Sequence, residues 1–178
     1  DELIREGIYR EEISEWDMDF FLPSAQLHDV GKIAITDLIL NKPGKLTEEE
    51  FEVMKTHVAV GVDAIEKIMN NAEEHAFLRH TLCIAGTHHE KWDGSGYPMG
   101  LKGLNIPLEG RLMAIADVYD ALISERPYKK AFTHEEACEI IESGAGSHFD
   151  PVLVEVFRKV EDEFARVAQE IGPSRRDQ

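Results

Sequence analysis

The sequence predicts an all-α fold, a helical bundle of one domain. Apolar residues recur at helical spacing in several segments, two segments open with a capping box, and no stretch shows the alternation of a β-strand. The 178 residues are 43% hydrophobic, which is enough for one sizeable core. We therefore expect a helical domain over residues 1–173, followed by a polar tail at 174–178.

The first segment contains apolar residues at roughly helical spacing, namely Leu3, Ile4, Ile8 and Ile13. This pattern predicts the tail of a longer amphipathic helix over residues 1–15. The chain opens in helical register without a methionine, so we expect a fragment whose N-terminal helix is truncated. The apolar surface left around these residues would then be covered by a partner copy or by upstream sequence.

A second apolar segment covers residues 18–30. Pro23 within it either kinks a helix or opens a new helix at Ser24. Gly31 is typical of a helix stop, and residues 31–46 are expected to form a loop.

Capping residues and prolines predict where the later helices begin. Thr47 and Thr133 are each followed three residues later by Glu, which is a capping box. Pro107 and Pro151 suit the first turn of a helix. Together with the apolar spacing, these signals predict helices over residues 48–69, 73–89, 107–124, 134–143 and 151–171.

Composition excludes several classes of protein. The net charge of −16 argues against a general binder of nucleic-acid polymers, because phosphate binding normally needs a basic face. Cys83 and Cys138 lack a CxxC spacing, so we expect reduced, buried thiols rather than a disulfide framework or a zinc cysteine cluster. No apolar run approaches the ~20 residues that span a bilayer, and no signal peptide opens the chain, so we expect a cytoplasmic location.

Histidines and aspartates indicate a metal site. His88 and His89 stand where a predicted helix gives way to a long glycine-containing loop over residues 90–106, and a helix end allows neighbouring imidazoles to reach one ion. Taken singly, His57 could be a satisfied helical side chain, and Asp117 could pair with a structural arginine. Jointly, the nitrogen and oxygen donors are those that divalent transition metals use, and they are His28, Asp29, His57, His88, His89 and Asp117. Two ions can share these six ligands if one carboxylate bridges them.

The motifs resemble those of the HD-GYP domain, a branch of the HD metal-dependent phosphohydrolase superfamily that hydrolyses cyclic di-GMP. The resemblance covers roughly residues 24–157. It is carried by His28-Asp29-Val30-Gly31-Lys32, Asn41-Lys42-Pro43-Gly44-Lys45-Leu46, His57, His88-His89-Glu90, Asp93-Gly94-Ser95-Gly96-Tyr97-Pro98, Ile106-Pro107-Leu108, Ala116-Asp117-Val118-Tyr119-Asp120-Ala121-Leu122, Arg126-Pro127-Tyr128-Lys129 and His148-Phe149-Asp150-Pro151.

The resemblance implies a role for each ligand. Asp29 would bridge the two ions and, with Lys32 on a phosphate oxygen, take part in catalysis. The other ligands of one ion would be His57, His88 and His89; the second ion would use His28 and Asp117. The resemblance implies iron or manganese, while the ligand types also permit zinc, cobalt or nickel.

The resemblance also implies substrate contacts, at Lys32, Gly94, Gly96, Tyr97, Asp120, Arg126 and Lys129. Tyr97 would face a guanine or the substrate backbone, with the two glycines allowing close approach. The segment with Arg126 and Lys129 could instead be a helix exit, and Asp120 could orient a ligating histidine.

The remaining polar candidates have structural interpretations. We expect His148 to order the loop before the last helix and Glu90 to support a ligand. Solvated side chains are expected for His75, His80 and His134. The resemblance further implies a His, or Glu and His, thirty or more residues before the His-Asp pair, but only residues 1–27 precede it. We therefore expect this chain to hold the ion at His28 and Asp117 weakly or not at all.

The expected function is a metal-dependent phosphodiesterase. It would use metal-activated water to hydrolyse cyclic di-GMP to linear pGpG, with further cleavage to GMP left open. A phosphohydrolase for another nucleotide and a catalytically idle binding or interaction module are the alternatives. The family suggests an upstream receiver or sensor domain and diguanylate cyclases as partners. The chain could also form a homodimer, and we expect no membrane association.

Overall fold

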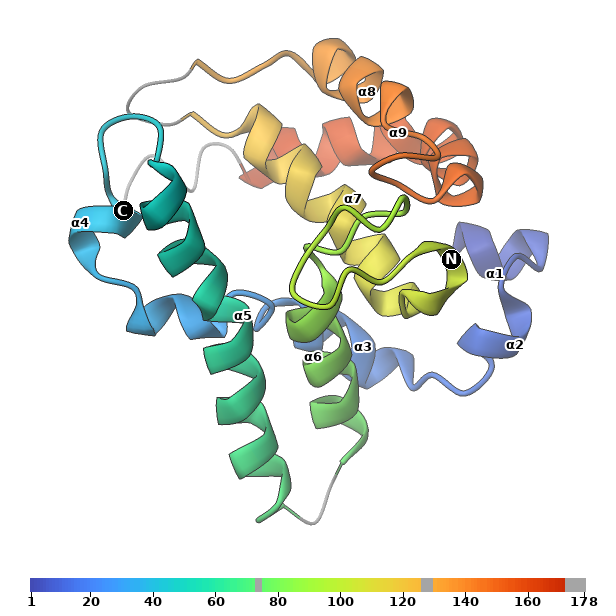
Figure 1. The fold of residues 1–178 in the computed structure, drawn as a ribbon. Coiled ribbons are helices and arrows are strands. Elements are labelled where there is room, and N and C mark those ends of the chain that lie inside the picture. Colours follow the sequence, from blue (N-terminus) through green and yellow to red (C-terminus); the bar gives the residue numbers. More distant parts are fainter. Residues whose placement is uncertain (73–74, 126–129, 172–178) are drawn as a thin grey trace.

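The computed structural model describes residues 1–72, 75–125 and 130–171, and every regular element in these ranges is helical (Figure 1). This confirms the all-α prediction for these residues. In chain order the elements are α1 (Glu2–Glu6), α2 (Arg10–Ile13), α3 (Met18–Ala25), the 3-10 helix η1 (Val30–Ala34), α4 (Asp37–Leu40), α5 (Glu48–Met69), α6 (Ala76–Thr87), the 3-10 helix η2 (Gly103–Asn105), α7 (Leu108–Ile123), α8 (His134–Ser143) and α9 (Pro151–Ile171).

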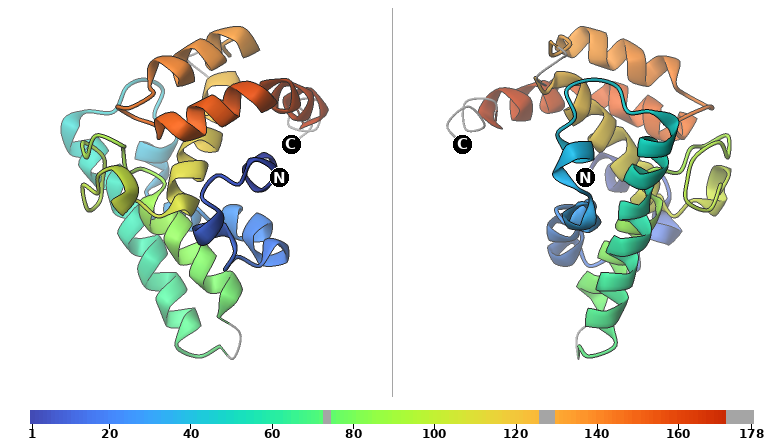
Figure 2. Two further views of the ribbon diagram at one scale, coloured as in Figure 1. Left: turned by 90° about the vertical axis from the view of Figure 1, so that its right-hand side faces the viewer. Right: turned by 60° about the vertical axis from the view of Figure 1, so that its left-hand side comes forward.

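Helix α7 connects the two halves of the molecule. Figure 2 shows α5 and α6 side by side at one end, while α8 and α9 lie at the other end. The larger core cluster joins α7 to α8 and α9 around fully buried side chains such as Leu108 and Ile141. A smaller cluster between α5 and α6 contains Ile65, Leu78 and Ala85. The helices that carry the candidate ligands therefore converge where these two halves meet.

The two predicted capping boxes are present. Thr47 Oγ1 accepts a hydrogen bond from the Glu50 amide at 3.2 Å, and the Glu50 carboxylate accepts one from the Thr47 amide at 2.7 Å. Thr133 and Glu136 form the same pair at 3.2 and 2.8 Å. Each box satisfies amide donors that a helix start leaves without a partner, which explains why α5 and α8 begin where the sequence predicted.

The prediction of one helix over the first residues is wrong, because Gly7 ends α1. Gly7 has the left-handed φ of 70°, and the amide of Ile8 donates to the carbonyl of Leu3 at 2.9 Å, which is a helix-terminating arrangement. A second helix, α2, follows after Tyr9. This turn brings Leu3 into the core at 8% exposure, whereas Ile4 remains 54% exposed. Part of the surface expected to need an outside partner is therefore covered by the chain itself.

Further boundaries differ from the predictions. Helix α3 continues through Pro23, so no new helix opens at Ser24. It ends at Ala25, so the helix stop predicted at Gly31 is wrong, and Gly31 lies inside η1. The segment 31–46, predicted as a loop, contains most of η1 and all of α4. No helix in the described ranges is long and apolar enough to cross a membrane. Cys83 and Cys138 are free thiols, the first half-buried and the second buried. The predicted domain end and polar tail fall on residues 172–178, outside the described residues, and stay predictions.

Arg111 is the centre of a buried polar network that fixes the N-terminal segment. Its guanidinium donates to Asp150 at 2.9 Å, to Glu12 at 2.8 Å and to the carbonyl of Ile106 at 2.8 Å. The Tyr9 hydroxyl donates to the same Asp150 carboxylate at 2.7 Å. Arg111 is 3% and Asp150 1% exposed, so both charges depend on these partners.

We predict that Arg111→Ala lowers the free energy of unfolding by about 3 kcal/mol, because it leaves the Asp150 carboxylate buried without its cation. Urea denaturation measures the loss. Arg158→Ala is the matched control, since its ion pairs with Glu142 and Glu155 lie on the surface, and its unfolding curve should stay close to that of the parent. Equal curves for all three proteins would contradict the prediction.

Candidate metal centre

The structure brings together all six predicted ligands from four segments of the chain. His28 follows α3, Asp29 precedes η1, His57 lies inside α5, His88 and His89 follow α6, and Asp117 lies inside α7. Their donor atoms form two groups in which the atoms lie within 4.8 Å of one another. One group is Asp29, His57, His88 and His89; the other is His28, Asp29 and Asp117.

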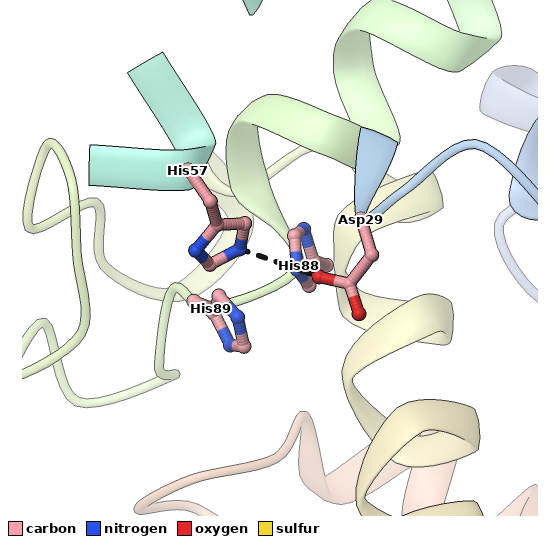
Figure 3. A group of neighbouring side chains, drawn as sticks. All are labelled: Asp29, His57, His88 and His89. Atoms are coloured by element: carbon pink, nitrogen blue, oxygen red, sulfur yellow. Dashed lines mark ion pairs between the residues drawn. The ribbon is translucent and has the colours of Figure 1, made fainter. Parts of the chain in front are cut away.

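The four-residue group surrounds one oxygen of Asp29. Figure 3 shows the three imidazoles and this carboxylate pointing toward one another. Asp29 Oδ1 lies 3.4 Å from His57 Nε2 and 3.8 Å from His88 Nε2. The ring centroids of His88 and His89 are 4.0 Å apart. His88 is the C-cap of α6 and His89 follows it, so the pair stands where the helix ends.

The three-residue group surrounds the other oxygen of Asp29. His28 Nε2 lies 3.2 Å from Asp29 Oδ2 and 3.7 Å from Asp117 Oδ1. The ammonium of Lys32 also pairs with Asp29 Oδ2. Each oxygen of the Asp29 carboxylate therefore faces a different group of donors, which is the arrangement that a bridging carboxylate requires.

Backbone carbonyls fix the proton position in three of the imidazoles. The Nδ1 atoms of His28, His57 and His88 lie 2.8, 2.7 and 3.0 Å from the carbonyls of Ala25, Met54 and Ile84. A carbonyl only accepts hydrogen bonds, so each Nδ1 must carry a proton. In the neutral ring the lone pair is then on Nε2, directed at the carboxylates, and the rings are oriented as metal ligands commonly are.

Several buried nitrogen and oxygen atoms that could bind a metal lack a hydrogen-bond partner among the described residues. They include Asp29 Oδ1, His57 Nε2 and His88 Nε2. Leaving such atoms unsatisfied in the interior costs about 1–3 kcal/mol each, and a cation between them would remove that cost. The donor set therefore fits a divalent transition metal.

The electrostatics of the centre favour neutral imidazoles beside a charged carboxylate. Burial and the neighbouring histidines lower the pKa of His88 to about 4 and that of His89 to about 2. Burial alone would raise the pKa of Asp29, but its contacts with His28 and Lys32 hold it well below its usual range. At neutral pH the lone pairs of His88 and His89 are thus available, and Asp29 carries its charge.

The other two ligands have shifted pKa values of a different origin. Burial lowers the pKa of His28, but its bonds to Asp29 and Ala25 and the nearby carboxylates outweigh this and raise it overall. Burial, with the charge of Asp29 and of the neighbouring Asp120, raises the pKa of Asp117. The three-residue group thus concentrates negative charge that a cation would neutralise.

Close backbone packing places Asp29 beside His57. A Cβ added to Gly31 would lie 1.9 Å from the carbonyl oxygen of His57 and 2.6 Å from the amide nitrogen of Gly61. Only a glycine allows η1 to approach α5 this closely. The small residue two positions after Asp29 therefore sets the spacing of the centre.

The loop over residues 90–106 is held by Glu90. This side chain is 2% exposed and accepts hydrogen bonds from the amides of Met99 at 2.7 Å and Leu101 at 2.9 Å. A Cβ at Gly96 would come within 2.5 Å of the Glu90 Cα, so the loop folds against its own start. Glu90 thus supports the loop, whereas the sequence interpretation had it supporting a metal ligand.

The predicted substrate residues lie at different distances from the centre. The Tyr97 ring stacks on His89 with centroids 4.7 Å apart, and its loop contains Gly94 with φ of 86°. Asp120 is exposed one turn after Asp117 on α7. Arg126 and Lys129 lie outside the described residues.

The expected solvation of His80 is wrong. His80 is 8% exposed, its Nδ1 lies 3.2 Å from Glu109, and it contacts Trp16 and Phe21 edge-on. Its position between Phe77 and Ile84 at helical spacing was the signal that could have shown this burial. His134 is likewise partnered, with its Nδ1 2.9 Å from the Tyr119 hydroxyl. His148 stacks on Phe149, and its carbonyl accepts from Trp92 of the loop, as an ordering role requires.

Comparison with known proteins defines the class. Residues 11–153 match the HD domain family, so the chain belongs to that family and, with its relatives, to the HD-GYP type. The helical fold resembles a crystal structure of a cyclic GMP-AMP specific phosphodiesterase of Vibrio cholerae, with a TM-score of 0.55, 22% identity and coverage of 84% of this chain and 39% of that one.

Curated relatives are more similar in sequence. A Vibrio cholerae protein named cyclic di-GMP phosphodiesterase is 54% identical over 151 residues, covering 85% of this chain and 31% of the relative. Another from the same organism, named 3′3′-cGAMP-specific phosphodiesterase 2, is 44% identical over 155 residues, covering 87% of this chain and 29% of the relative. The chain thus spans about a third of the length of these relatives.

We predict that Gly31→Ala lowers the free energy of unfolding by about 1–3 kcal/mol and weakens metal binding, because its methyl group pushes η1 away from α5. Urea denaturation and the visible spectrum of the cobalt-loaded protein measure the two effects. Gly86→Ala is the control, since its Cβ would meet a single flexible methyl group of Val62 at 3.3 Å. Unchanged cobalt affinity in Gly31→Ala would contradict this account of the spacing.

Proposed function

We propose that this chain is a metal-dependent phosphodiesterase domain that hydrolyses cyclic di-GMP. The observation that carries the proposal is the Asp29 carboxylate, whose two oxygens face two separate groups of metal-ligating atoms. The name of a relative at 54% identity supports cyclic di-GMP as the substrate. In the reaction a water oxygen bonds to phosphorus and the 3′ oxygen leaves, which opens the ring to linear pGpG; a second cleavage to GMP is part of the test below.

The donor set supports two ions. Asp29, His57, His88 and His89 would hold one of them, while His28, Asp29 and Asp117 would hold the other. Two bound divalent ions lower the pKa of a water and stabilise the charge that develops during in-line attack on phosphorus. Mixed imidazole and carboxylate donors suit iron or manganese, which we propose, and also zinc, cobalt or nickel.

Besides the metal ions, the ammonium of Lys32 places a positive charge at the centre. Its side chain is 36% exposed and its ammonium pairs with Asp29 Oδ2, so it is reachable by a substrate phosphate at the edge of the centre. With a cation held at Asp29 Oδ2, the ammonium would be free to contact a phosphate oxygen and would stabilise the anionic transition state. Asp29 and Lys32 are therefore the proposed catalytic residues.

The loop and α7 supply the proposed substrate contacts. Tyr97 stands next to His89, so a group bound at the ions lies within reach of its ring. Gly94 and Gly96 shape the loop that presents Tyr97, and Asp120 follows one turn after Asp117. For Arg126 and Lys129 the proposal rests on the sequence resemblance alone.

A second substrate has specific support. The relative at 44% identity is named for 3′3′-cGAMP, so that dinucleotide is the alternative for the same site. Because the relatives are about three times as long, an upstream receiver or sensor domain, diguanylate cyclase partners and a homodimer are proposals for the whole protein. Tight dinucleotide binding without turnover by the metal-loaded chain would favour the idle binding module instead.

We predict that manganese-loaded protein, purified anaerobically, converts cyclic di-GMP to pGpG, and that Asp29→Ala abolishes this turnover because both ions lose a ligand. Liquid chromatography of the products measures it and shows whether GMP follows. Asp63→Ala is the matched control, since Asp63 is an exposed carboxylate paired with Lys67 and lies in neither ligand group. Full turnover in Asp29→Ala would refute the proposed mechanism.

We predict that the two groups lose metal separately. Asp117→Asn should remove the ion of the three-residue group, whereas His57→Asn should remove the ion of the four-residue group, which we expect to bind more tightly because it has one more ligand. Elemental analysis after manganese dialysis gives the ions per chain. Loss of both ions from either single variant would show that the groups do not bind independently.

A further inference from the structure

Phe51 is an exposed aromatic residue of α5. It lies in the first turn of α5, at helical spacing with the buried Val58, yet 45% of its surface is accessible. An exposed aromatic ring needs no explanation by itself. Its neighbours, however, connect it directly to the metal centre.

A row of rings leads from the ligands to Phe51. The ring centroids of His89 and Tyr97 are 4.7 Å apart with planes at 27°, and those of Tyr97 and Phe51 are 6.1 Å apart with planes at 86°. Because the last two planes are nearly perpendicular, a flat group can stack on only one of them and meets the other at its edge. Phe51 is therefore the outer end of an aromatic surface that begins at a metal ligand.

A cation stands over both outer rings. The Nζ atom of Lys55, one turn after Phe51, lies 5.5 Å from the Phe51 centroid and 5.7 Å from the Tyr97 centroid. The Lys55 ammonium also forms an ion pair with the exposed carboxylate of Glu52 at 2.5 Å, and the Lys55 side chain is 27% exposed. Lys55 can therefore exchange a weak surface ion pair for a ligand.

Two rings and one ammonium are the groups that recognise a purine base. Aromatic side chains stack on nucleobases of any sequence. A lysine adds selectivity, because guanine presents two acceptors, O6 and N7, along one edge. Adenine replaces O6 with an amino donor, which a lysine ammonium repels.

We propose that Phe51, Lys55 and Tyr97 form a base-binding ledge for one guanine of the cyclic dinucleotide. The base stacks on Phe51, and Lys55 donates to its O6 and N7 edge. The new assignments are Phe51 and Lys55, and the inference rests on the proposed function, since it places the base beside a phosphate held at the metal centre. Lys55 is then the residue that favours guanine over adenine.

The test is steady-state kinetics of the metal-loaded protein with cyclic di-GMP, cyclic di-AMP and bis(p-nitrophenyl) phosphate, a diester without a nucleobase. Phe51→Ala should raise KM for cyclic di-GMP about 10-fold with kcat little changed, and Phe51→Trp should restore it. Lys55→Ala should raise the same KM and reduce the preference for cyclic di-GMP over cyclic di-AMP about 10-fold. All variants should retain turnover of the nitrophenyl diester.

Matched controls lie on the same helix. Val53→Ala removes a side chain that is 42% exposed, and Lys67→Ala removes a surface ion pair with Asp63; both should keep the parent KM. Suppose that the parent hydrolyses cyclic di-GMP while Phe51→Ala and Lys55→Ala keep the parent KM and the parent preference for cyclic di-GMP over cyclic di-AMP. This result would refute the ledge and leave the proposed function standing. Parent protein that cleaves only the nitrophenyl diester would overturn both the proposed function and the ledge.

Discussion

The centre depends on one carboxylate that two groups of ligands share. Asp29 Oδ1 faces His57 and His88, while Oδ2 faces His28 and the ammonium of Lys32. Oδ1 is buried without a hydrogen-bond partner among the described residues, which is unfavourable for the protein alone. Binding a cation reverses this cost, so metal binding and folding stability are linked through the same atom.

The backbone positions this carboxylate and its imidazoles. Gly31 lets η1 lie against α5 beside His57, and the end of α6 directs His88 and His89 into one space. Carbonyl groups within the same helices hold the imidazole protons on Nδ1, so the rings need little reorganisation to bind an ion. Farther out, Glu90 holds the loop that sets Tyr97 on His89, which extends the ordered surface from the ligands toward solvent.

Local signals and motif spacing predicted most of the fold and which side chains gather at the centre. Thr47 and Thr133 fixed two helix starts because capping acts within four residues. What failed depends on tertiary context. The helical spacing of apolar residues at the start of the chain continues across Gly7, but the left-handed backbone of Gly7 ends α1. The resemblance implied that Asp29 is shared by both groups, but which of its oxygens faces which group needed the three-dimensional arrangement.

Anomalous diffraction from crystals of manganese-loaded protein tests the shared carboxylate most directly. We predict two peaks about 3.5–4 Å apart, one on each side of the Asp29 carboxylate. The first should lie among His57, His88 and His89, and the second, between His28 and Asp117, should be weaker because that group has one ligand fewer. Two peaks of which only one contacts Asp29, or a single peak distant from it, would contradict the account.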